Sequence, residues 1–195
     1  METYKNLKKG TKVGLIVSAV LMLVVLVAGV IGAVQAFIAG RTTTAIFTVT
    51  DVIMGVLVLF YAFVGYKKPH GNLLRYVFFA FAIYLALQAT LDIASKSFYI
   101  VGDAGVLAAL LLSYVAGRLN KIKKNIFILL FVGLLILARV IVNCVTFPGS
   151  FGFFNVFGCM TSIIIFAALG FAYVARYEEH KAAGLADKAD VETNE

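Results

Sequence analysis

The chain has 195 residues, of which 62% are hydrophobic and only 14% are charged, and its mean hydropathy is +0.99. A soluble domain is about 25% charged and about 45–50% apolar, so the composition excludes a water-soluble globular fold and leaves no room for a separate catalytic or nucleic-acid-binding domain. The formal net charge of +7 therefore indicates how the chain is oriented in a membrane rather than an affinity for nucleic acid.

Six apolar segments are each long enough to span a bilayer, which takes about 20 residues. In chain order they cover residues 13–38, 44–66, 73–95, 98–117, 125–147 and 151–175. The sequence therefore predicts an all-α polytopic membrane protein with six transmembrane helices arranged as three helical hairpins. A basic cytoplasmic N-terminus (1–12) precedes this transmembrane domain (13–175), and a disordered cytoplasmic tail (176–195) follows it.

Basic residues are distributed unevenly between the predicted loops. They cluster before the first span, in the second and fourth loops and after the last span, whereas only Arg41 and Lys96 are assigned to the opposite side. Lys and Arg concentrate in cytoplasmic loops, so this pattern predicts that both termini are cytoplasmic. The predicted location is the cell membrane, with a multi-pass topology.

Four charged residues interrupt the apolar segments: Asp51, Asp92, Asp103 and Arg139. A charge at the centre of a bilayer costs about 2.5–3.5 kcal/mol on insertion scales, so such residues mark functional or paired positions. At a rise of about 1.5 Å per residue, Asp51 and Arg139 lie roughly 10–12 Å from the outer ends of their spans, deeper than the other two. The two deepest charges are therefore predicted to contact each other.

Uncharged polar side chains accompany these charges in the outer half of the predicted bundle. Gln88 and Asp92 are four residues apart, as are Arg139 and Asn143, so each pair shares one face of its helix. Exposing a polar face to lipid costs free energy, so we expect these faces to turn toward the interior of the bundle. There they would line a polar cavity that opens to the outside of the membrane. The candidate binding residues are Asp51, Gln88, Asp92, Asp103, Arg139, Asn143 and Asn155.

The charges of this constellation suggest what it would bind. Three acids and one base give a net charge of −2 when all are ionised, which attracts cations or protons more than anions. The sequence therefore predicts an integral membrane protein that binds or transports a small, cationic solute through the cavity. The alternative is a structural or stress-related membrane protein whose polar cluster serves helix packing only. The expected partners are the lipid bilayer and the solute; a homo-oligomer and a partner subunit both remain open.

An enzyme is the less favoured class. The motifs HExxH, GxSxG and Cys-x-x-Cys are absent from the sequence, so we expect no catalytic residue, metal site or cofactor. Cys144 and Cys159 lie at different predicted depths, which disfavours a disulfide between them. Small residues four apart on the first span, such as Gly29 and Ala33, permit close helix contact within the bundle or between protomers.

Overall fold

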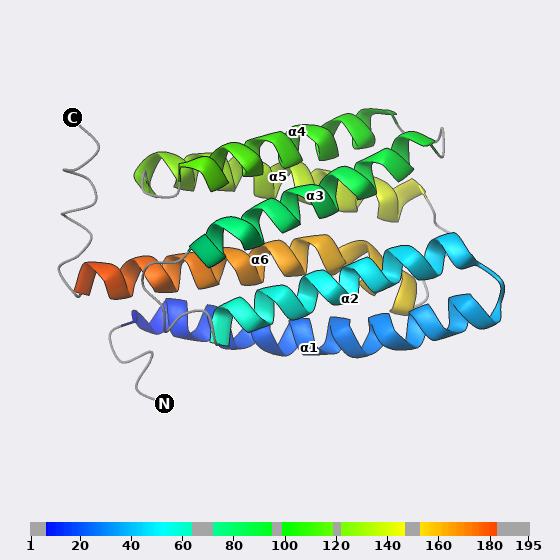
Figure 1. The fold of residues 1–195 in the computed structure, drawn as a ribbon, viewed down its shortest axis with the longest axis horizontal. Coiled ribbons are helices and arrows are strands. Elements are labelled where there is room, and N and C mark those ends of the chain that lie inside the picture. The colour runs from blue at the N-terminus through cyan, green and yellow to red at the C-terminus, as the bar shows by residue number, and fades with distance from the viewer. Residues whose placement is uncertain (1–6, 64–71, 95–98, 119–121, 147–152, 183–195) are drawn as a thin grey trace.

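The computed structural model describes residues 7–63, 72–94, 99–118, 122–146 and 153–182 (Figure 1). Every regular element in these ranges is a helix, which confirms the predicted all-α fold with six helices. The helices are α1 (Lys9–Ile38), α2 (Thr42–Phe63), α3 (Asn72–Ala94), α4 (Tyr99–Gly117), α5 (Ile122–Thr146) and α6 (Phe153–Ala182). Helices are the form these apolar segments require, because a helix satisfies its backbone hydrogen bonds without water.

The outer surface of the bundle is apolar. Within the described residues, five helices are long and apolar enough to cross a bilayer, and α4 contributes a shorter apolar stretch, Gly102–Gly117. Large side chains such as Ile16 on α1 and Phe127 and Leu134 on α5 are exposed. An exposed apolar surface of this extent is stable only against lipid, so the chain is a multi-pass membrane protein in contact with the bilayer.

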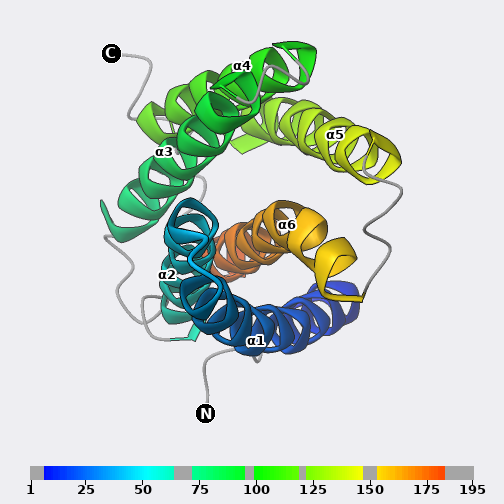
Figure 2. The ribbon, with the colours of Figure 1, turned by 90° about the vertical axis from the view of Figure 1, so that its right-hand side faces the viewer.

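The helices are arranged in two groups of three (Figure 1, Figure 2). One group contains α1, α2 and α6, and the other contains α3, α4 and α5. Consecutive helices contact one another as the predicted hairpins require, most extensively α3 with α4 and α1 with α2, although α6 contacts α1 more extensively than it contacts α5. The two groups meet where α2 packs on α3 and where α6 packs on α5.

Glycine residues allow the close approach of the helices within two of the hairpins. A Cβ added to Gly29 of α1 would lie 2.8 Å from a methyl carbon of Val52 in α2. A Cβ added to Gly105 of α4 would lie 2.8 Å from the Cβ of Ala89 in α3. Gly29 therefore serves a contact within the bundle, one of the two uses expected for the small residues of the first span.

The turn between α1 and α2 depends on Gly40. Its φ of +69° lies in the left-handed region, which glycine enters at no steric cost. The N–H of Gly40 donates to the carbonyl of Phe37 at 3.0 Å, and the N–H of Arg41 donates to the carbonyl of Ala36 at 2.8 Å. These two bonds satisfy two carbonyls of the last turn of α1 within the turn that reverses the chain, and α2 begins at Thr42.

Helix α6 extends beyond its predicted end. Residues 176–182 were predicted to belong to the disordered tail, but they are helical. The extension is held by Glu178, whose carboxylate accepts hydrogen bonds from the backbone N–H of Lys8 and from Oγ1 of Thr11, each at 2.9 Å. Lys8 is the N-cap residue of α1 and makes no capping bond with its own side chain, so Glu178 caps α1 from another helix.

This contact also brings the two ends of the described chain to the same end of the helix bundle. That arrangement fits an even number of spans. The assignment of this end to the cytoplasm stays a prediction, as does the disorder of residues 183–195, which lie outside the described residues.

We expect Glu178→Gln to loosen the first turn of α1. The variant loses a carboxylate at the positive end of a helix dipole, an interaction typically worth about 1 kcal/mol. Hydrogen exchange of the amides of residues 8–11 should accelerate, while exchange in the centre of α1 should not change. Glu179→Gln is the matched control, because the buried Oε1 of Glu179 has no hydrogen-bond partner within the described residues. Equal exchange in the two variants would contradict the capping role.

Candidate functional site

A polar network joins three helices in the half of the bundle that contains the α1–α2 turn. Nε2 of Gln88 on α3 donates to Oδ1 of Asp51 on α2 at 3.2 Å. Oε1 of the same Gln88 accepts from Nη2 of Arg139 on α5 at 3.1 Å. Asp51 and Arg139 therefore belong to one network, as their matching depths suggested, with the amide of Gln88 bridging them.

Tyr84 completes this network. It lies one helical turn before Gln88 on α3, is buried, and makes a side-chain hydrogen bond with Asp51. Arg139 is also buried, at 6% exposure, whereas Asp51 and Gln88 are half-buried. We call these four residues (Tyr84, Gln88, Asp51 and Arg139) the outer network. It connects the first helix group, through α2, with the second group, through α3 and α5.

The outer network contains three of the seven predicted binding residues. Asp103 does not belong to it: the side chain is exposed on α4. The side chains of Asp92, Asn143 and Asn155 lie outside the described residues, and so do those of Cys144 and Cys159. The described network contains one acidic and one basic side chain, so it is electrically balanced, unlike the predicted constellation of three acids and one base.

A second polar network, which was not predicted, lies toward the opposite end of the bundle. Nη1 of Arg176 on α6 donates to the hydroxyl of Tyr61 on α2 at 3.4 Å. Tyr173, one turn before Arg176, makes a hydrogen bond with the side chain of Asn125 on α5. Nδ2 of Asn125 in turn donates to the backbone carbonyl of Arg118 at 2.7 Å.

We call Tyr61, Asn125, Tyr173 and Arg176 the inner network. Its sequence signal was weak, because tyrosine resembles an apolar residue in a hydropathy profile, and because Asn125 and Arg176 border the predicted spans. The spacing of Tyr173 and Arg176, three residues apart on α6, is the one pattern that could have indicated it.

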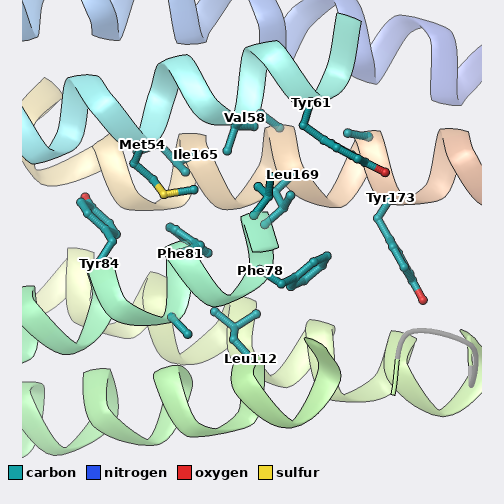
Figure 3. Close-up of a cluster of buried hydrophobic side chains, with 14 of the residues drawn as sticks. Met54, Val58, Tyr61, Phe78, Phe81, Tyr84, Leu112, Ile165, Leu169 and Tyr173 are labelled. Carbon is teal, nitrogen blue, oxygen red and sulfur yellow. The ribbon is translucent and has the colours of Figure 1, made fainter. Parts of the chain in front are cut away.

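An apolar layer separates the two networks. Figure 3 shows Tyr84 at one end of a buried cluster and Tyr61 and Tyr173 at the other. The side chains between them come from α2, α3, α4 and α6 and are fully or almost fully buried: Met54, Val58, Phe78, Phe81, Leu112, Ile165 and Leu169. The rings of Phe81 and Tyr84 stack with centroids 5.6 Å apart, so the layer begins directly beside the outer network.

Comparison with family models, with curated proteins and with solved structures finds no match for this chain.

Proposed function

We propose that this integral membrane protein binds or transports a small, cationic solute, and that Asp51 is the group that receives it. The observation that supports the proposal most directly is the position of Asp51, a half-buried carboxylate in a membrane-spanning helix at the junction of the two helix groups. Intramembrane acids at such junctions typically serve solute, ion or proton binding.

The outer network also offers a means of coupling binding to helix movement. A cation at Asp51 would compete with the N–H of Gln88 and be repelled by Arg139, which Gln88 holds nearby. Binding would therefore weaken the link between α2 and the second helix group. A ligand shifts a conformational equilibrium only by such a difference in its interactions with the two states. The apolar layer would then block passage toward the inner network until the helices move.

The alternative is a structural role, and one observation favours it. The members of the outer network satisfy one another: Asp51 accepts from Gln88 and is bonded to Tyr84, and Gln88 accepts from Arg139. Hydrogen bonds between membrane helices contribute about 0.6 kcal/mol each on average, so such a network can act as helix packing alone. The two functions differ in whether the charge of Asp51 is needed.

The variant Asp51→Asn distinguishes the solute-binding role from the structural role, because asparagine keeps the shape of the side chain and an acceptor oxygen but removes the charge. We expect proteoliposomes containing the wild-type protein to take up methylammonium faster than empty liposomes, or to admit protons faster, as reported by the pH indicator pyranine trapped inside. In Asp51→Asn this excess should be lost. Asp51→Glu, which keeps the charge, should retain part of it.

Thermal unfolding of each variant in detergent is the control for folding. Asp51→Asn removes the anion that balances buried Arg139 in the outer network, so it should unfold at a lower temperature than the wild type, but still in one cooperative transition above the assay temperature. A wild-type flux equal to that of empty liposomes for both probes would contradict the proposal. So would a full flux in a well-folded Asp51→Asn, and either result would favour the structural role.

A further inference from the structure

Two arginine side chains are held in place at the end of the α3–α4 hairpin. Nε of Arg75, near the start of α3, donates to the carbonyl of Ala116 in the last turn of α4 at 3.2 Å. Nη1 of Arg118, just after α4, donates to the hydroxyl of Tyr114 at 2.7 Å, and its guanidinium carbon lies 4.8 Å from the centroid of that ring. Both arginines are nevertheless exposed.

The two guanidinium groups are held in position, but most of their hydrogen-bond donors are not used within the described residues. A guanidinium carries five N–H donors, and within the described residues each of these groups uses one of them. Ordering by Ala116 and Tyr114 lowers the entropy lost when a ligand binds, since the side chains are already positioned. The remaining N–H groups form the planar fork that matches two oxygens of a phosphate.

The surroundings of these arginines favour a ligand that lies in the membrane. Tyr76, the residue after Arg75, is 64% exposed, and on α4 Leu110 is 64% exposed one turn before Tyr114. Tyrosine side chains concentrate at the level of lipid headgroups, and exposed leucine is favourable against acyl chains. A phosphate held by the arginines would therefore lie at the edge of a lipid-facing apolar surface.

The charge of this end of the bundle points to the same ligand. Figure 1 places the first turn of α3 and the last turn of α4 on the side where α1 begins and α6 ends. Exposed Lys8, Lys9 and Lys181 lie on that side. Basic residues at a membrane surface each contribute about 1 kcal/mol to the attraction of anionic lipids.

We propose that Arg75 and Arg118, supported by Tyr114 and Tyr76, bind the headgroup of an anionic phospholipid at the end of the α3–α4 hairpin. The headgroup phosphate contacts the free N–H groups, and the acyl chains lie along the exposed apolar face. This site is separate from the outer network and does not depend on the function proposed for it.

The test is lipid binding by the purified full-length protein in a zwitterionic detergent. Dioleoylphosphatidylglycerol is titrated against dioleoylphosphatidylcholine, and the bound lipid is counted by native mass spectrometry. We expect the wild type to prefer phosphatidylglycerol and the double variant Arg75→Gln/Arg118→Gln to bind it about 30-fold more weakly. Arg118→Gln alone should give an intermediate loss, and this variant leaves the bond from Arg75 to Ala116 in place.

Arg41→Gln is the matched control, because Arg41 is an exposed arginine at the opposite end of the bundle. It should bind phosphatidylglycerol like the wild type. Three results would overturn the proposal: unchanged binding in the double variant and in Arg118→Gln, an equal loss in Arg41→Gln, or displacement of the lipid by millimolar inorganic phosphate. The last result would show a site for soluble anions.

Discussion

Arg139→Leu should destabilise the bundle by about 3–5 kcal/mol, the loss typical when one partner of a buried charged pair is removed. The guanidinium of Arg139 is buried and donates to Gln88, which in turn donates to Asp51. Without it, the carboxylate of Asp51 has no cation among the remaining members of the outer network. Thermal unfolding in detergent, followed by far-UV circular dichroism, measures the effect.

Exchanging the two charges tests whether they act as a pair. In Asp51→Arg combined with Arg139→Asp, the amide of Gln88 can turn over, because its two ends are a donor and an acceptor of similar shape. The double variant should therefore unfold at a higher temperature than either single variant. A double variant no more stable than the worse single one would show that the two charges are not coupled.

Gly105→Ala is predicted to separate α3 from α4. The added Cβ would lie 2.8 Å from the Cβ of Ala89 and 3.5 Å from its Cα. A methyl group on a helix backbone cannot rotate away, so the two helices must move apart, and overpacking of this kind typically costs about 1–3 kcal/mol. The unfolding temperature in detergent should fall accordingly.

Gly170→Ala provides the control for this prediction. Gly170 is also a helical glycine, in α6, but a Cβ added there meets no atom within 4 Å in the described structure. The substitution should be neutral or should stabilise the helix by about 0.5–1 kcal/mol, because alanine loses less conformational freedom than glycine. If both substitutions had the same effect, close packing at Gly105 would not be what stabilises the α3–α4 hairpin.

The features predicted correctly from the sequence are those that depend on one segment at a time. Apolar length is enough to locate six helices, because lipid imposes the helical form on each segment separately. The depth of a charge follows from the helical rise, which is why Asp51 and Arg139 were assigned to one level. Gln88 was predicted to share this outer region, although its position between the two charges was not predicted.

The pairing of helices distant in the sequence could not be predicted in this way. Every span has apolar faces, and lipid tails are as apolar as leucine, so hydropathy does not identify which faces meet. The contact of α6 with α1 depends on shape, as where Gly14 accommodates the ring of Phe171, and on the capping of Lys8 by Glu178. The inner network was missed because tyrosine resembles an apolar residue in a hydropathy profile, and because Asn125 and Arg176 lie at the borders of the predicted spans.

The grouping of α6 with α1 and α2 has a consequence for biosynthesis. The ribosome releases α6 after α1–α5, so α3, α4 and α5 can associate in the bilayer while the first group is still incomplete. During that interval the first turn of α1 has no Glu178 to accept from the N–H of Lys8 and the hydroxyl of Thr11, and the face of α1 around Gly14 has no Phe171 to cover it. The contacts of the first turn of α1 with Glu178, and of Gly14 with Phe171, can therefore form only after α6 has been synthesised.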